Sequence, residues 1–278
     1  MNTPKVSAVC CTYGRFECVQ RVINCYIAQD YPNKELIVYN TDEINPYVDY
    51  DCKLLPYNIL IINRGIDFIT KEPYTNVGAI RRDALQFAEG DYVVTWDDDD
   101  IFLPHFMRQG IDRIQETGLP SFKPEMSFFY SGDYLRLVRN TLEASIIADI
   151  NKVREYGYLL HSGKEGLGWY TKMRDKRELN EHDSNYIPSY CFNWNDGRQM
   201  KAPHKQSGDI DNPRNFQIHK DHSLDKVNGR RVEIYNEERL AETYKPYFDF
   251  LRENIEGLPP ELVERYIPKL LQEYREAN

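Results

Sequence analysis

The chain has 278 residues, of which 41% are hydrophobic and 13% aromatic, and this composition supports a packed core and argues against intrinsic disorder. The length suits one large domain or two ordinary ones. The formal net charge of −9 argues against a protein that coats nucleic acid with its whole surface, although a local basic region remains compatible with it.

The cysteines and the apolar runs bear on the compartment in which the protein is expected. The six cysteines include no Cys-x-x-Cys pair and most lie in apolar segments, so we expect reduced thiols in the core. No run approaches the ~18 apolar residues of a membrane-spanning helix, and no signal-peptide apolar region follows the N-terminus. These features predict a soluble, cytoplasmic protein without a membrane span.

The first hundred residues alternate between strand patterns and helix patterns. A nearly continuous apolar run at 6–11 predicts a strand buried on both faces, and helical spacing follows at 16–27. Further apolar runs predict strands at 36–39, 58–62 and 92–96. Before the last of these, we expect a helix that Asn76 caps and Gly90 ends. This order predicts an α/β fold with a mostly parallel sheet flanked by helices.

The elements become shorter beyond residue 100. The patterns predict a helix at 106–114, a hairpin of 126–130 and 134–138, a strand-like run at 143–150, and helices at 152–156 and 165–178. Periodicity fails at 196–231, where basic residues outnumber acidic ones, and this predicts a long, positively charged loop. Two amphipathic helices are expected within 232–278, packed on the main domain.

Four adjacent carboxylates, Asp97 to Asp100, directly follow the strand predicted at 92–96. Adjacent carboxylates repel one another, and a divalent cation such as Mg²⁺ or Mn²⁺, which prefers oxygen ligands, would neutralise them. In open α/β sheets, ligands bind outside the carboxyl ends of the strands. An isolated acidic run is most often a solvated loop, so the prediction of a metal site also depends on the segments that precede it.

Three segments, 6–15, 76–82 and 92–100, occur in a characteristic order and spacing. They resemble the opening strand and loop, the Asn-x-Gly segment with its basic residues, and the strand ending in Asp-x-Asp-Asp of family 2 GT-A glycosyltransferases. The resemblance covers roughly residues 5–105. It implies a GT-A fold, a nucleotide-sugar donor with UDP as the default, and Mn²⁺ or Mg²⁺ as cofactor.

The resemblance also implies the donor site. Asp97 and Asp99 fall on the two carboxylates that hold the metal against the donor diphosphate. The residues implied to contact the nucleotide sugar are Thr12, Tyr13, Arg15, Asn40, Asp42, Asn76, Arg81, Arg82, Asp97 and Asp98. The family usually has Asp at the end of the second strand to bind uracil. Here the sequence is Tyr-Asn-Thr-Asp, so either Asn40 substitutes or Asp42 reaches the base.

Glycosyl transfer also needs a carboxylate that removes the proton of the acceptor hydroxyl. Gly163-Lys164-Glu165, followed by Trp169, resembles the family's Gly-Glu-Asp segment and implies Glu165 as the catalytic base. Asp183 is a rival base. The alternative for Glu165 is an acidic residue at a helix start, and for Asp183 a residue of a solvated turn. A base opposite the leaving diphosphate would make the reaction inverting.

We predict a GT-A domain at 1–195, whose halves 1–100 and 101–195 bind donor and acceptor, a basic loop at 196–231 and a helical extension at 232–278. The residues expected on the acceptor side are Asp100, Trp169, Lys201, Lys205, Arg230 and Arg231. The predicted acceptor is a glycan or, because the loop is basic, hydroxylated DNA.

Two other functions stand beside the glycosyltransferase. The first is a non-catalytic carbohydrate- or nucleic-acid-binding module on a GT-A scaffold, against which the intact Asp97, Asp99 and Glu165 argue. The second is a phosphohydrolase. It is disfavoured because its nucleophilic Asp-x-Asp normally ends the first strand, where this chain has Val9-Cys10-Cys11.

Overall fold

The computed structural model describes residues 3–44, 52–54, 57–130, 135–140, 143–181, 189–193 and 234–235. The rival base Asp183, the predicted basic loop with Lys201, Lys205, Arg230 and Arg231, and nearly all of the C-terminal extension lie outside these residues. Those expectations, and the domain boundaries drawn through them, stay predictions. In the described part of the chain, no helix has both the length and the apolar character needed to cross a bilayer.

The fold is built on a seven-stranded sheet with the order β3-β4-β2-β1-β5-β10-β7. Its four central strands are parallel, and they are β4 (Ile59–Asn63), β2 (Lys34–Asn40), β1 (Val6–Thr12) and β5 (Tyr92–Thr95). Antiparallel pairing adds β3 (Cys52–Leu54) beside β4, β10 (Ile147–Asp149) beside β5, and β7 (Ser121–Phe122) beside β10. The predicted α/β fold with a mostly parallel sheet is confirmed.

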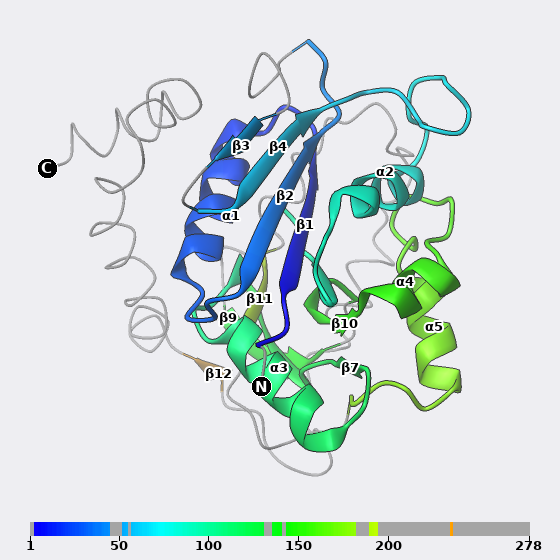
Figure 1. Cartoon of the computed structure of the whole chain (residues 1–278). Helices are drawn as coiled ribbons and strands as arrows, with labels where there is room; N and C mark the ends of the chain where they lie inside the picture. Colours follow the sequence, from blue (N-terminus) through cyan, green and yellow to red (C-terminus); the bar gives the residue numbers. More distant parts are fainter. Residues whose placement is uncertain are drawn as a thin grey trace, which may run out of the picture.

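Helices cover both faces of this sheet (Figure 1). One face carries α1 (Phe16–Ala28) and α3 (Phe106–Thr117), and the other carries α2 (Val77–Ala84), α4 (Ile150–Tyr156) and α5 (Leu167–Asp175). The sequence of β1 is apolar throughout because both faces of the strand are buried. Ala8 and Cys10 pack on the first face, and Val9 packs on the second.

A second, five-stranded sheet has the order β12-β9-β8-β11-β6. Its strands are β6 (Ile101–Phe102), β8 (Met126–Tyr130), β9 (Leu135–Arg139), β11 (Tyr190–Asn193) and β12 (Ile234–Tyr235). The antiparallel pairing of β8 with β9 confirms the predicted hairpin. The pairing of β6 with β11 was not predicted, and it places the acidic tetrad in the turn that connects the two sheets.

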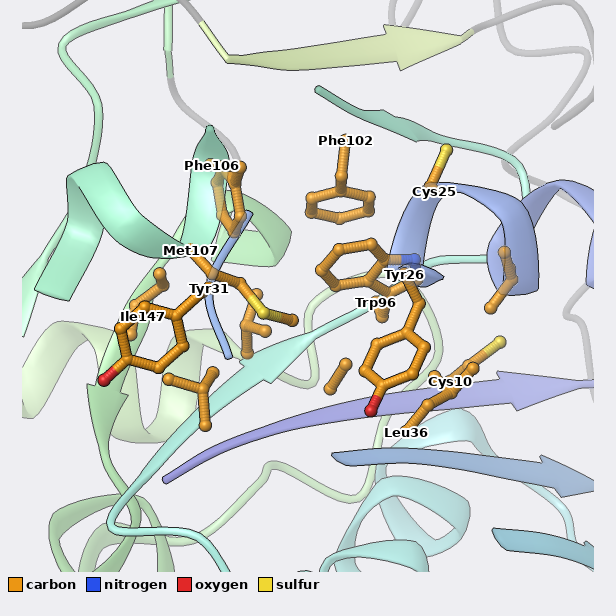
Figure 2. Close-up of a cluster of buried hydrophobic side chains, with 14 of the residues drawn as sticks. Cys10, Cys25, Tyr26, Tyr31, Leu36, Trp96, Phe102, Phe106, Met107 and Ile147 are labelled. Carbon is orange, nitrogen blue, oxygen red and sulfur yellow. The ribbon is translucent and has the colours of Figure 1, made fainter. Parts of the chain in front are cut away.

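Two aromatic side chains fix the ends of that turn (Figure 2). Trp96 precedes the tetrad and Phe102 follows it, and both are fully buried. Their rings are stacked, with centroids 3.9 Å apart and planes 18° from parallel, and Phe106 packs edge-on against Phe102 at 5.0 Å. Close packing restricts movement of both anchors, so the four carboxylates are held in a defined turn.

The predicted end of the helix before β5 and the strand predicted at 143–150 differ from the structure. Helix α2 ends at Ala84 and continues as a 3₁₀ turn, so Gly90 does not end it. Gly90 instead allows close packing, because a Cβ at this position would lie 2.5 Å from Oγ of Ser7. The run predicted as a strand at 143–150 is only partly β10, since it begins with a 3₁₀ turn, Glu143–Ser145, and Ile150 starts α4.

Candidate active site

The candidate site lies at the carboxyl ends of β1 and β5, which are parallel neighbours. Strand β1 leads into the loop that carries Thr12 and Arg15, and β5 leads into the tetrad. Because parallel strands end at the same edge of a sheet, the two loops meet there, at the edge where open α/β sheets bind ligands.

Asp98 and Asp100 are the inner pair of the tetrad, only 2% and 1% exposed. Asp98 accepts a hydrogen bond from Oγ1 of Thr12 at 2.7 Å and is gripped by Arg15, whose Nε lies 2.9 Å from Oδ2. Burial raises the pKa of Asp98 to about 6, although the charge of Arg15 opposes this shift. Asp100 accepts a hydrogen bond from the hydroxyl of Tyr190. The inner pair therefore ties the turn to the β1 loop and to β11.

Asp97 and Asp99 are the outer pair, with side chains 29% and 12% exposed. Oδ1 of Asp97 accepts a hydrogen bond from Arg81 at 2.7 Å, and Oδ2 of Asp99 lies 3.5 Å from Arg15. Among the described residues, nothing donates a hydrogen bond to Oδ2 of Asp97 or to Oδ1 of Asp99. Burial raises the pKa of Asp97, Arg81 lowers it, and the neighbouring charge of Asp99 raises it.

The outer pair fits a hard divalent cation. Carboxylate oxygens are the donors that Mg²⁺ and Mn²⁺ prefer, and a cation would remove the repulsion between Asp97 and Asp99. The described residues include no group of three or more His, Cys, Asp or Glu side chains that could hold a metal by themselves. Such a site therefore suits a cation that one or two carboxylates share with the phosphates of a substrate.

Arg81 brings the predicted base to the tetrad. It lies on α2, is 7% exposed, and its NH2 group is 2.7 Å from Oδ1 of Asp97 and 3.1 Å from Oε1 of Glu165. Glu165 is 4% exposed, and its second oxygen, Oε2, is buried without a hydrogen-bond partner in the described structure. A buried carboxylate with one unpartnered oxygen beside the candidate metal site matches the position expected of a base.

The Asn-x-Gly segment holds the loop that carries Glu165. The side-chain oxygen of Asn76 caps α2, and the backbone N–H groups of Val77 and Gly78 bind the loop at 3.2 and 3.1 Å. A Cβ on Gly78 would lie 1.8 Å from the carbonyl oxygen of Leu159, so only glycine allows this approach. The polar groups of Asn76 thus serve the fold, and the segment positions the loop that carries Glu165.

Asn40 and Asp42, the two candidates for contact with the nucleobase, have different surroundings in the structure. The side chain of Asn40 is used within the fold, since Oδ1 accepts hydrogen bonds from the backbone of Gly14 and of Asp42, each at 3.1 Å, and Nδ2 donates to Asn63 at 2.9 Å. The carboxylate of Asp42 borders the β1 loop, because a Cβ on Gly14 would lie 2.4 Å from its Oδ2. Gly14 also has a φ of 62°, which favours glycine.

Two predicted site residues are placed elsewhere. Arg82 follows Arg81 but makes ion pairs with Asp67 at 2.8 Å and Asp83 at 2.7 Å, away from the tetrad. Trp169 is 2% exposed and belongs to the core between the sheet and α5, so it does not present a ring to an acceptor. Tyr13 is half-buried in the β1 loop beside the site.

Two residues that the sequence did not single out also reach the site. Arg21 on α1 donates a hydrogen bond to the backbone oxygen of Asp98 at 3.0 Å. Glu143 packs against the residue after Glu165, since a Cβ on Gly166 would lie 2.3 Å from its Cγ. Burial raises the pKa of Glu143, with Arg81 opposing the shift. No pattern marked either residue, because one lies within a helix and the other opens a strand-like run.

Most of the described part of the chain matches the model of a known protein family. The family model described as "Glycosyl transferase family 2" matches residues 7–160, which is more than half of the chain and includes the tetrad. The chain belongs to glycosyl transferase family 2. The family resemblance expected from the sequence is thereby confirmed, and the site described above is the candidate active site of a glycosyltransferase domain.

Individual family relatives and solved structures agree with this assignment. WcaA of Escherichia coli (strain K12), named as a glycosyl transferase of colanic acid biosynthesis, is 25% identical over 139 residues, which are 48% of this chain and 44% of WcaA. The chain thus spans less than half the length of that relative. Residues 1–349 of Staphylococcus aureus TarS, crystallised with UDP-GlcNAc, match with a TM-score of 0.53 and 16% identity over 90% of this chain and 74% of that one. This likeness confirms the predicted GT-A fold.

Proposed function

We propose that this family 2 domain is an inverting glycosyltransferase that uses a divalent cation and moves a sugar from a nucleotide-sugar donor to a hydroxyl acceptor. One observation carries the proposal: Asp97, with one open oxygen, and Glu165, with one unpartnered oxygen, meet at the same guanidinium, that of Arg81. The bound UDP-GlcNAc of TarS supports a UDP-sugar as the donor.

The outer pair of carboxylates is the metal site of the proposal. Asp97 and Asp99 would hold Mn²⁺ or Mg²⁺ against the donor diphosphate through their open oxygens. A bound cation supplies a Lewis acid that stabilises the charge developing on the leaving diphosphate. The inner pair keeps the turn in place, because Arg15 and Thr12 hold Asp98 while Tyr190 holds Asp100.

Glu165 is the catalytic base of the proposal. Its Oε2 takes the proton from the acceptor hydroxyl, and the acceptor oxygen forms a bond to the anomeric carbon of the donor sugar. The bond from that carbon to the diphosphate oxygen breaks, and its electron pair leaves with the nucleoside diphosphate. Attack from the side opposite the leaving group inverts the anomeric centre.

Asp42 is the residue that we propose for nucleobase recognition. The side-chain amide of Asn40 is hydrogen-bonded to the backbone and to Asn63, whereas the carboxylate of Asp42 lies against Gly14 at the β1 loop. A carboxylate accepts hydrogen bonds, so it would bind the N–H group of uracil. The preference for UDP over other nucleotides would therefore depend on Asp42.

A donor assay tests the proposed function. The protein is incubated with UDP-, GDP- and CMP-sugars in the presence of Mn²⁺, and release of the nucleotide is measured with and without EDTA. We expect the protein to turn over a UDP-sugar, and we expect EDTA to abolish this turnover. A donor that raises the melting temperature without being turned over, in the presence of hydroxyl acceptors, would instead support a binding module on a GT-A scaffold.

A further inference from the structure

Arg81, which the family resemblance implied to contact the nucleotide sugar, contacts two carboxylates in the structure. It is 7% exposed, and one of its terminal nitrogens, Nη2, contacts the carboxylates of both Asp97 and Glu165. It therefore connects the end of β5, which carries the candidate metal ligand, with the loop before α5, which carries the candidate base.

Charge explains why such a bridge is needed. The carboxylates of Asp97 and Glu165 meet at one guanidinium, and Glu165 is 4% exposed while the side chain of Asp97 is 29% exposed. Neighbouring carboxylates repel each other, and a cation between them offsets this repulsion. Glu143 adds a third acidic group near the same guanidinium. Without Arg81, Glu165 would lose the ion pair at 3.1 Å that orients its carboxylate toward Asp97.

The other two nitrogens of the Arg81 guanidinium make no hydrogen bond to a described residue. Nε and NH1 of Arg81 are buried, and neither has a hydrogen-bond partner in the described structure. The ion pairs with Asp97 and Glu165 are therefore the polar contacts that orient it, and they leave Oε2 of Glu165 without a hydrogen-bond partner among the described residues.

We propose that Arg81 is a positioning residue that bridges Asp97 to Glu165, so that the base is held beside the metal site with Oε2 directed to the acceptor hydroxyl. This inference rests on the proposed function and adds a residue whose action passes through the base. It differs from the expectation that Arg81 grips the donor diphosphate, because a diphosphate ligand would contribute to donor affinity and a bridge would contribute to turnover.

Substitution of Arg81 separates the two roles. In Arg81→Met, which keeps the length of the side chain and removes its charge, we expect kcat for transfer to fall roughly 10²-fold or more, as for loss of a positioned base. The Kd of UDP with Mn²⁺, measured by calorimetry, should stay about the same. In Arg81→Ala, which leaves the space of the side chain empty, guanidinium added at millimolar concentration should restore part of kcat, which a purely structural defect would not allow.

Arg82→Met is the matched control. It removes the same charge one residue further along α2, but its partners are Asp67 and Asp83. Its kcat should stay near the wild-type value and should not respond to guanidinium. A UDP Kd that rises in Arg81→Met in parallel with the loss of activity would overturn the bridge in favour of a phosphate ligand. Unchanged kcat in Arg81→Met would overturn it outright.

A thermal unfolding cycle tests the bridge without any turnover. Arg81→Met should lower the melting temperature, because it leaves buried carboxylates without a counter-ion, and adding Glu165→Gln should recover part of the loss. The same cycle with Arg82→Met should be additive. Additive effects in both cycles would contradict the bridge, whereas failure of every nucleotide-sugar in the donor assay would contradict the proposed function alone.

Discussion

The two edges of the parallel sheet treat their acidic residues differently. At the amino edge, Glu35 uses one oxygen to accept from Ser7 at 2.6 Å and the other to pair with Lys5 at 2.6 Å. Asp149 caps α4, accepting from the backbone of two residues at 2.8 and 3.1 Å. At the carboxyl edge, Asp97 and Glu165 each keep an oxygen that accepts no hydrogen bond from the described residues.

The difference shows how a ligand site can be recognised before any ligand is seen. Folding normally satisfies buried polar atoms, as it does at the amino edge. An edge where several carboxylates stay partly unsatisfied is costly for the fold alone, and a bound cation and substrate would supply the missing partners. We therefore expect the satisfied carboxylates of the amino edge to serve stability and the partly unsatisfied ones of the carboxyl edge to serve chemistry, and substitutions of the two kinds should separate these effects.

The largest effect is expected at the outer carboxylates. Asp97→Asn or Asp99→Asn keeps the size of the side chain but weakens its interaction with a hard cation. Turnover should fall by orders of magnitude while circular dichroism and the melting temperature stay close to those of the wild type. Full activity of the double variant, or of the wild type in excess EDTA, would show that the reaction needs no divalent cation at this site.

The next largest effect is expected at Glu165, the proposed base. Glu165→Gln keeps the volume and cannot accept a proton, so kcat should fall by about 10²–10⁴-fold. Donor affinity, measured by calorimetry with Mn²⁺, should survive. If Asp183→Asn abolishes turnover while Glu165→Gln does not, the base is Asp183.

The inner carboxylate Asp98 should affect stability more than binding. Asp98→Asn breaks a buried ion pair with Arg15, and removing one partner of such a pair costs roughly 3–5 kcal/mol of unfolding free energy. Chemical denaturation measures this loss. The exposed pair of Asp30 and Arg108, 3.3 Å apart, is the control, and Asp30→Asn should cost about 1 kcal/mol or less.

The smallest effect is expected at the amino edge. Asp149→Ala removes the cap of α4 and should cost about 1 kcal/mol of unfolding free energy, the usual value for a helix cap. Turnover per folded molecule should not change. A large loss of activity in this variant would contradict the division of roles between the two edges.

Much of the fold was predictable from the sequence. The continuous apolar runs of β1, β2 and β5 are what a parallel strand buried on both faces requires, and the helical spacing from Phe16 onward predicted α1. The second sheet was not predictable in full, because β6 and β12 have two residues each and pair with strands far away in the chain.

The candidate site was predictable in its residues more than in their roles. Asp97 and Asp99 stood out by their place after a strand, but which carboxylates keep an open oxygen depends on the partners that the fold brings to Asp98 and Asp100. Arg81 and Arg82 are adjacent, and successive helical residues point about 100° apart, so one reaches the tetrad and the other reaches Asp67. Whether Glu165 or Asp183 is the base stays a prediction.

The central claim is that the open oxygens of the outer carboxylates hold a cation shared with a nucleoside diphosphate. Titration of Mn²⁺ followed by electron paramagnetic resonance, with and without UDP, measures this binding directly. We expect one bound Mn²⁺ per chain, with an affinity that rises when UDP is present. In Asp97→Asn and in Asp99→Asn this binding of Mn²⁺ should be lost. Binding of Mn²⁺ and UDP that is equal in the wild type and in both variants would contradict it.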